Sequence, residues 1–184
     1  MPHYIAFLRG INLGKRRIKM EQLKPLFEEL KFSSVETFIA SGNVIFTAKS
    51  ADARKLEKQI EAHLGKSLGY DVDTFLRTRA EVAAVAAHRP FAAADLDHPD
   101  HTVHASFLRE PFSAAQIKQL LAARSPVDEF HVEGREYYWL CRIKTHESKV
   151  WASPQMKLVK LPTSSMRNLT TIRKLAALYP APAA

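Results

Sequence analysis

A basic, glycine-containing stretch near the start of the chain, AFLRGINLGKRRIKM (residues 6–20), is the first candidate for chemistry. Its glycines and cations are Gly10, Gly14, Arg9, Lys15, Arg16, Arg17 and Lys19. Glycine lets a backbone approach a ligand closely, arginine binds phosphate or carboxylate through two hydrogen bonds, and a helix start presents free N–H groups. The stretch therefore predicts an anion-binding loop. It matches neither the GxxxxGK[ST] phosphate loop nor the GxGxxG dinucleotide motif, and a solvated basic connection is the alternative.

Other residues with reactive side chains give weaker signals. The segment DLDHPDHTVH (95–104) has side chains that suit zinc, but their spacing matches no helix-borne motif, so we favour a solvated connector and expect no metal or cofactor. Cys141 lies in the apolar run EYYWLCR, where a buried thiol is normally inert. Tyr137, Tyr138 and Trp139 could stack bases, yet core or interdomain packing is the better interpretation.

The charge of the chain is concentrated at its two ends. The formal net charge is +8 over 184 residues, and it divides into +5 for residues 1–20, −4 for 21–141 and +7 for 142–184. If the two ends meet, they form a basic face that attracts phosphates or nucleic acid. A single cysteine excludes an internal disulfide, and no apolar run approaches a membrane span. We expect a cytoplasmic protein with no membrane partner.

Hydrophobic periodicity predicts the elements that position the basic loop. Strands are expected at 4–9, 35–40, 44–48 and 72–77, and helices at 20–30, 52–66 and 79–88. The second half repeats this order less regularly, with strands at 102–109 and near 163–167, a hairpin over 128–142 that turns near Gly134, and helices at 113–124 and 170–178. Between 142 and 163 we expect an irregular helical stretch that Pro154 interrupts.

Three similarities in the same order indicate an internal duplication. YIAFLRGI (4–11) resembles HASFLREP (104–111), and FLRTRAEVAAVAAHRP (75–90) resembles SSMRNLTTIRKLAALYP (164–180). VETFIASGNVIF and VDEFHVEGREYY each place a glycine between two strand-like runs. The expected class is α+β, with two ferredoxin-like β-α-β-β-α-β units that each have a mainly antiparallel sheet and helices on one face. The expected boundaries are 1–91, a linker at 92–101, and 102–184.

This topology predicts which segments are neighbours. The connection after the first strand and the Ser41–Asn43 turn lie at the same end of an antiparallel ferredoxin-like sheet. The turn therefore adds short polar side chains to the basic loop. The matching segments of the second half, Arg109–Ser113 and Glu133–Arg135, include acids and a proline, so only the first copy suits an anion.

Several long motifs resemble one bacterial family. YIAFLRGINLG, the run KM..L......LKF..VETFIASGNVIF and RNLTTIRKL are similar to the family called "domain of unknown function 1697". The resemblance implies two ferredoxin-like subdomains and no established activity. It marks motif positions at Arg9, Gly10, Asn12, Ser41, Gly42, Asn43, Arg167, Asn168, Thr171 and Lys174. Leu169 stands where the resemblance leads us to expect a tryptophan.

Together these observations predict an anion site but no reaction. We expect a phosphate-bearing ligand at the basic loop, including Lys15 and Lys19, beside the Ser41–Asn43 turn, with Arg167–Lys174 as a further contributor. Arg9 and Arg167 could equally pair with neighbouring groups, and Asn168 could cap the last helix. A nucleic-acid-binding module is the first alternative. An enzyme for a small phosphorylated or carboxylated substrate is the second, with unknown catalytic residues. The sequence leaves the oligomeric state open.

Overall fold

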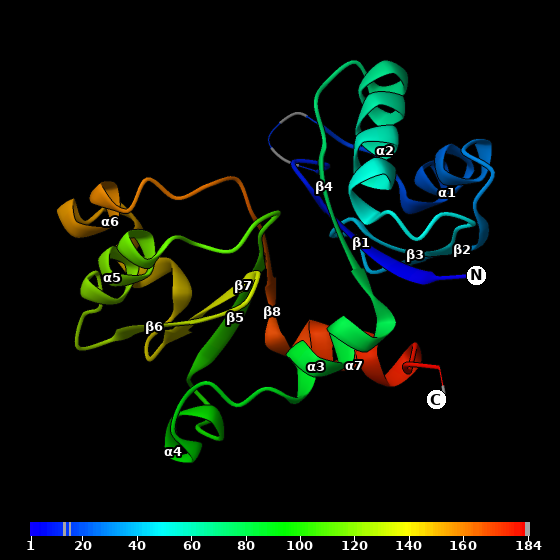
Figure 1. Cartoon of the computed structure of the whole chain (residues 1–184). Coiled ribbons are helices and arrows are strands. Elements are labelled where there is room, and N and C mark those ends of the chain that lie inside the picture. Colours follow the sequence, from blue (N-terminus) through cyan, green and yellow to red (C-terminus); the bar gives the residue numbers. More distant parts are fainter. Residues whose placement is uncertain (13, 15, 183–184) are drawn as a thin grey trace. The chain divides into compact units, whose positions relative to one another are not determined.

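The computed structural model of the chain describes residues 1–12, 14 and 16–182. It is an α+β protein with two four-stranded antiparallel sheets, of strand orders β2-β3-β1-β4 and β6-β7-β5-β8 (Figure 1). Both orders are consistent with the ferredoxin-like fold, which confirms the expected fold class. The chain forms two compact units: unit 1 is Met1–Ala84 with Leu175–Ala184, and unit 2 is Val85–Lys174.

Unit 1 contains the first sheet and the two helices that cover one of its faces. Its elements are β1 (His3–Arg9), α1 (Met20–Glu29), β2 (Ser33–Phe38), β3 (Asn43–Thr47), α2 (Ala53–Leu68), β4 (Asp73–Thr78) and most of α3 (Arg79–Ala87). Alternate residues of β1, Tyr4, Ala6 and Leu8, face the core with Phe27 of α1 and Ile60 of α2. The apolar faces of α1 and α2 therefore pack against one face of the sheet in a single buried layer.

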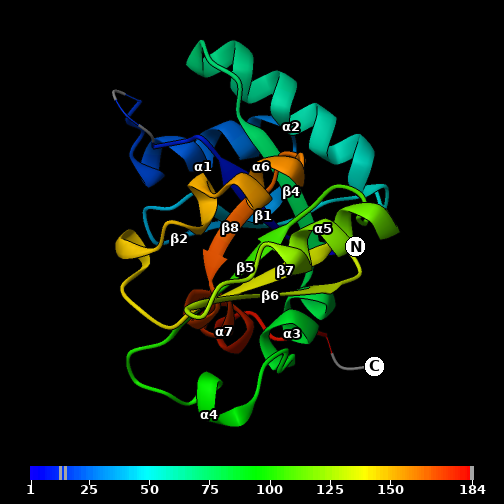
Figure 2. The same cartoon turned by 90° about the vertical axis from the view of Figure 1, so that its left-hand side faces the viewer.

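Unit 2 repeats this plan around the second sheet. Its elements are α4 (Ala93–Leu96), β5 (Thr102–Phe107), α5 (Ala114–Ala122), β6 (Asp128–Glu133), β7 (Glu136–Cys141), the 3₁₀ turns η1 (Thr145–Glu147) and η2 (Val150–Ala152), α6 (Pro154–Leu158), β8 (Ser165–Asn168) and the first part of α7 (Leu169–Leu178). Helices α5 and α6 lie beside each other (Figures 1 and 2). Leu120, Met156 and Trp139 belong to the same buried cluster.

The register of the two sheets confirms the duplication. Ile5 on β1 pairs with Arg77 on β4, and Ala105 on β5 pairs with Arg167 on β8. Both arginines also fold back on their own strand, since Arg77 Nη1 donates to the carbonyl of Leu76 at 2.8 Å and Arg167 Nη1 to that of Met166 at 2.9 Å. The two similarities in sequence thus correspond to equivalent strands and to an equivalent side-chain position.

Two details of the second half differ from the expected pattern. Pro154 begins α6 instead of interrupting a helix, because proline suits the first helical position and Ser153 caps it by accepting from the Met156 amide at 3.1 Å. The segment expected to be a linker contains the short helix α4. Among the described residues, none of the helices has the length and apolar character that a membrane crossing requires.

Candidate functional site

The connection between β1 and α1 lies against the turn between β2 and β3, as the topology predicts. The amide of Leu8 donates to the carbonyl of Gly42 at 2.9 Å, and Asn12 Nδ2 donates to the carbonyl of Ala40 at 3.2 Å. Asn12 Oδ1 also accepts from the amide of Ile18 at 2.9 Å. One asparagine therefore closes the loop on itself and fastens it to the turn.

Gly42 allows this close approach. Its φ is +75°, and a Cβ at this position would lie 2.7 Å from Ile11 Cγ2 and 3.1 Å from Leu8 Cβ. Only glycine fits both the backbone conformation and the space. Asn43 braces the turn from inside, since its fully buried side chain donates to the Phe38 carbonyl at 3.1 Å and to Ser41 Oγ at 2.8 Å. Gly42 and Asn43 thus shape the turn, and Ser41 is part of that network.

An open groove of about 770 Å³ lies where the loop enters α1. We call it the α1 groove. It is lined by Asn12, Arg17, Ile18, Lys19, Met20, Glu21, Gln22 and Ala40. Two cations and the first turn of a ten-residue helix therefore face the same space, together with the Glu21 carboxylate. This combination can bind an anion, because the first amides of a helix have no intrahelical acceptor and carry a positive partial charge.

The residue that begins α1 distinguishes it from its counterpart in unit 2. At α5, Ser113 Oγ accepts from the Gln116 amide at 3.3 Å, and Gln116 Oε1 accepts from the Ser113 amide at 3.0 Å. At α1, Gln22 Oε1 accepts from the Lys19 amide at 3.1 Å. The reciprocal bond needs a side-chain acceptor at the N-cap, and lysine has none. The chain therefore makes both side-chain bonds of a capping box at α5 and only one of them at α1, where the Gln22 amide donates to the Lys19 backbone carbonyl at 2.9 Å instead.

The remaining cations of the loop have different environments. Arg9 Nη1 lies 3.5 Å from Asp73 Oδ2, in a pair exposed enough to be weak. The guanidinium of Arg16 lies over the ring of Tyr70, 4.5 Å from its centroid. Arg17 Nη1 donates to the Arg16 carbonyl at 3.0 Å. Lys15 falls outside the described residues.

Gly10 gives the chain its sharp exit from β1. Its φ is +81°, and a Cβ there would lie 3.5 Å from Arg16 Nη1. Gly10 therefore has a conformational role beside the basic side chains.

The predicted site residues near the C-terminus belong to unit 2. Arg167 Nη1 donates to Ser165 Oγ at 3.0 Å, and burial lowers the pKa of Arg167 to about 10. Asn168 Oδ1 accepts from the Thr170 amide at 2.8 Å, which supports its role in capping α7. Leu169 is 2% exposed, so this position is part of a core. The participation of Arg167, Asn168, Thr171 and Lys174 in one site with the loop stays a prediction of the sequence.

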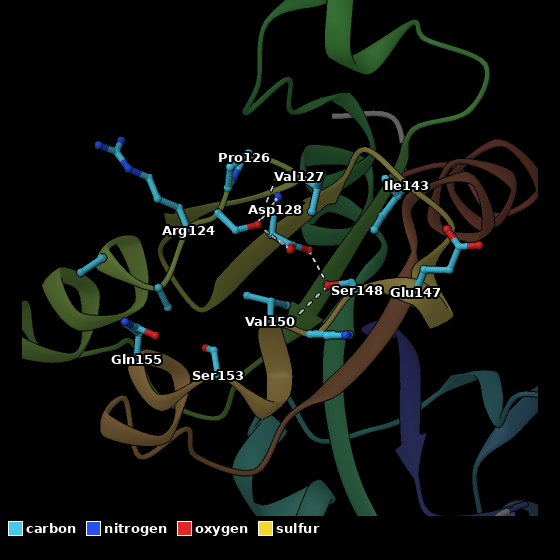
Figure 3. A pocket seen from close by; sticks show the side chains of 14 residues that line it. Arg124, Pro126, Val127, Asp128, Ile143, Glu147, Ser148, Val150, Ser153 and Gln155 are labelled. Carbon is cyan, nitrogen blue, oxygen red and sulfur yellow. Dashed lines mark hydrogen bonds between the residues drawn. The ribbon is translucent and has the colours of Figure 1, made fainter.

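Unit 2 has a second cavity, of about 490 Å³, which the sequence did not reveal. Figure 3 shows Asp128 and Ser148 pointing toward each other, whereas Arg124 extends away from them. Asp128 Oδ1 accepts from Ser148 Oγ at 2.7 Å and from Trp139 Nε1 at 2.9 Å, and Oδ2 accepts from Ser125 Oγ at 2.8 Å. These bonds engage both carboxylate oxygens, so Asp128 holds the surrounding loops in place. Only the Ser-Pro turn before β6 hints at this arrangement in the sequence.

The cysteine and the aromatic run of β7 have structural environments. Tyr137, Tyr138 and Trp139 are each about 2% exposed or less, which confirms the interpretation as core residues. Cys141 is buried, and burial raises the pKa of its thiol, as expected for an unreactive cysteine.

Comparisons with known proteins agree with this architecture. The two ferredoxin-like units define a class of duplicated α+β proteins, and the family model described as "Protein of unknown function (DUF1697)" matches residues 1–138. The chain belongs to this family. A similar solved structure is the conserved bacterial protein SP0830 from Streptococcus pneumoniae, with 21% identity, a TM-score of 0.75, and coverage of 97% of this chain and 98% of that chain. This likeness shows the fold. Comparison with curated proteins gives no match.

Proposed function

We propose that the protein binds an anionic, phosphate-bearing ligand in the α1 groove. The observation that carries the proposal is the lysine at the start of α1. Lys19 has no side-chain acceptor for the helix amides, whereas the equivalent Ser113 has one and uses it. The Gln22 amide already donates to the Lys19 carbonyl at 2.9 Å, so oxygens of a bound anion would accept from the preceding amides of the first turn, those of Met20 and Glu21.

The side chains around the groove support an anion more than a cation. Arg17 and Lys19 both line it, and arginine adds paired hydrogen bonds to phosphate. Glu21 opposes them, since its carboxylate lies in the first turn of the same helix. The ligand would therefore gain affinity from two cations and lose some of it to one carboxylate.

The equivalent position in unit 2 is less suited to an anion. A smaller cavity of about 280 Å³ lies where β5 leads into α5, and Glu110 and Pro111 line it with Arg109. A carboxylate replaces part of the positive charge, and proline removes one amide donor. The asymmetry between the two copies supports binding at the first copy alone.

The test is a titration of the full-length protein with inorganic phosphate at constant ionic strength, followed by thermal unfolding. A panel of nucleotides and sugar phosphates then defines the ligand class. A specific ligand raises the free energy of unfolding by about 2.7 kcal/mol at a hundredfold excess over Kd. Arg17→Ala should weaken binding roughly tenfold, the equivalent of about 1.4 kcal/mol. Glu21→Gln should strengthen it.

Lys58→Ala supplies the matched control, because Lys58 is an exposed lysine on α2 away from the groove. It should leave the phosphate affinity unchanged. Equal losses in Arg17→Ala and Lys58→Ala would mean that the protein attracts anions by net charge alone. Lys174→Ala, in the same titration, tests the contribution expected from the second unit.

A nucleic-acid-binding module is a second candidate, and the charge distribution favours it. The first 20 residues carry +5 and the last 43 carry +7. An oligonucleotide complex should weaken linearly in log K with log salt, with a slope set by the number of phosphates contacted. A pocket ligand should show a much shallower dependence. The groove itself offers no residue whose geometry assigns a reaction, so an enzymatic role has no named catalytic residue.

A further inference from the structure

A cluster of metal-ligating side chains lies in unit 2, and none of its members lines the α1 groove or the two cavities described above. One ring nitrogen each of His88 and His131 and one carboxylate oxygen of Glu133 all lie within 4.8 Å of one another. His131 and Glu133 alternate along the edge strand β6, so the pleat places both on one face of the sheet. His88 follows directly after α3 and meets them there.

Packing fixes the two imidazoles near each other. The ring centroids of His88 and His131 are 5.2 Å apart, and the Tyr138 ring lies 5.1 Å from His88 and 6.1 Å from His131. Phe91 packs its edge against His131 at 6.5 Å. Aromatic packing of this kind holds the two imidazole rings in position, which favours a metal site.

The hydrogen-bond pattern at these histidines is incomplete. Within the part of the chain that the structure describes, Nε2 of His88 and Nε2 of His131 are both buried and have no hydrogen-bond partner. A buried polar atom without a partner costs about 1–3 kcal/mol, so two of them side by side need a physical reason. Coordination to a cation satisfies an imidazole nitrogen as well as a hydrogen bond does.

We propose that His88, His131 and Glu133 bind a divalent cation of the zinc class. Two imidazoles with one carboxylate suit Zn²⁺ better than Mg²⁺ or Ca²⁺, which prefer oxygen ligands. Tetrahedral zinc requires ligand atoms about 3.3 Å apart, so the three side chains must draw together on binding, and the exposed Glu133 has the most freedom to rotate. Three protein ligands leave a fourth position for water or a further ligand. The proposal is independent of the α1 groove.

A competing cluster lies in the segment before β5. His98 and His101 stack with centroids 3.9 Å apart, and His101 Nδ1 lies 3.3 Å from Asp95 Oδ1. The Asp95 carboxylate, however, already receives two hydrogen bonds from Arg142, each at 2.8 Å. These two histidines therefore provide the control for adventitious binding of a metal by imidazole groups outside the proposed site.

The experiment titrates metal-free full-length protein with Zn²⁺ alone, in competition with a chromogenic chelator, and with Co²⁺ for its visible absorption spectrum. We expect one tight site with a tetrahedral Co²⁺ spectrum. His131→Gln and His88→Gln should each reduce the affinity at least tenfold, and the double variant His98→Gln/His101→Gln should leave it unchanged. Circular dichroism of each metal-free variant checks that the fold is intact.

Glu133→Gln keeps the test decisive if a histidine variant fails to fold, because Glu133 is exposed on an edge strand. It should weaken Zn²⁺ binding and alter the Co²⁺ spectrum. The proposal is overturned if the wild type binds no Zn²⁺, or if binding survives Glu133→Gln and is lost in His98→Gln/His101→Gln. Either result leaves the anion proposal for unit 1 unaffected.

Discussion

At the scale of single residues, Ile39 has an unfavourable backbone conformation in the turn beside the α1 groove. Its φ is +51°, a conformation in which a β-branched side chain is strained, and half of its surface is exposed. Its neighbour Ala40 lines the groove and accepts the hydrogen bond from Asn12. The turn therefore holds a strained residue next to the candidate site, a common property of binding loops.

Ile39→Gly should be more stable than Ile39→Ala by about 1 kcal/mol, because only glycine escapes the Cβ clash at positive φ. Both variants lose the isoleucine side chain beyond Cβ, so the difference between their free energies of unfolding measures the cost of the positive φ. Urea unfolding of the two variants measures it. At Lys58, in the exposed middle of α2, the order should reverse, with glycine less stable than alanine by about 1 kcal/mol. The same order at both positions would exclude strain at Ile39.

Single residues also show what the sequence can and cannot predict about the site. Arg9, Gly10 and Asn12 stand out by type, and topology places them beside the Ser41–Asn43 turn. The hydrogen-bond partner of each side chain is not predictable, because it depends on interatomic distances that the topology alone does not determine. Asn12, for example, braces the loop through its hydrogen bond to the turn. The position of Arg17 in the lining of the groove becomes evident only when the start of α1 after Lys19 is known. His88 and His131 are far apart in sequence and share no motif.

At the scale of elements, the junction of loop and turn depends on glycine at one position. Gly42→Ala should cost about 2–4 kcal/mol, since the new methyl group meets Ile11 at 2.7 Å in a backbone that already disfavours it. Gly69→Ala is the control, because Gly69 ends α2 with a similar φ of +76° and has no atom within 4 Å of its position for a Cβ. It should cost only about 1 kcal/mol. Chemical denaturation distinguishes the two, and equal losses would contradict the close approach.

A bidentate salt bridge connects the segment around α4 to the end of the second sheet. Arg142 donates to Asp95 through Nε and Nη2, both at 2.8 Å, and to Glu129 through Nη2 at 2.6 Å. The hydrogen bonds from Arg142 hold the pKa of Asp95 below its ordinary value of 3.8. Because the folded-state pKa is lowered, the pair contributes its full stabilising free energy at pH values above the ordinary pKa of 3.8. This contribution is lost as the pH falls through the folded-state pKa.

Asp95→Asn should therefore cost roughly 2 kcal/mol at neutral pH, and the difference from wild type should vanish as the pH falls well below 4. His101 faces the same carboxylate, with Nδ1 3.3 Å from Asp95 Oδ1. Asp97→Asn is the control, since its pair with Arg89 is more than half exposed on both sides and is worth under about 1 kcal/mol. Urea titrations across this pH range measure both. A constant Asp95 difference would contradict the linkage.

Element order was more predictable than element boundaries. The period of 3.6 residues identifies α1 and α2, because each buries one apolar face, whereas β1, β3 and β4 are buried on both faces and appear in the sequence as short apolar runs. The same pattern fails for α4 and for the turns between β7 and β8, which are too short to show a period. Their conformation depends on contacts such as Asp95 with Arg142 and Ser148 with Asp128, which link residues distant in sequence.

At the scale of the whole molecule, the last helix links the two units through the chain. Helix α7 runs from Leu169 to Leu178, while unit 2 ends at Lys174 and unit 1 resumes at Leu175. In unit 1, Tyr179 donates to Glu36 at 2.7 Å, and burial with this carboxylate raises the pKa of Tyr179 to about 12. The expected division into 1–91, a linker at 92–101 and 102–184 stays a prediction, and a fragment ending at 91 would lack the Tyr179 contact.

A helix shared by two units should couple their unfolding, because helical hydrogen bonds form and break cooperatively. Both tryptophans of the chain, Trp139 and Trp151, belong to unit 2, whereas Gly42 belongs to unit 1. Gly42→Ala should therefore lower the midpoint seen by tryptophan fluorescence as much as that seen by far-ultraviolet circular dichroism, by about 2–4 °C for each kcal/mol lost.

Independent units would give a different result in the same experiment. The fluorescence midpoint of Gly42→Ala would then match the wild type, and the circular dichroism curve would separate into two transitions. Lys174→Gly tests the link itself, because it weakens α7 at an exposed residue where the chain passes from unit 2 into unit 1 and removes no core side chain. Combined with Gly42→Ala, it should reduce the shift in fluorescence while the shift in circular dichroism persists. Coupling that survives this substitution would mean that α7 is not what transmits it.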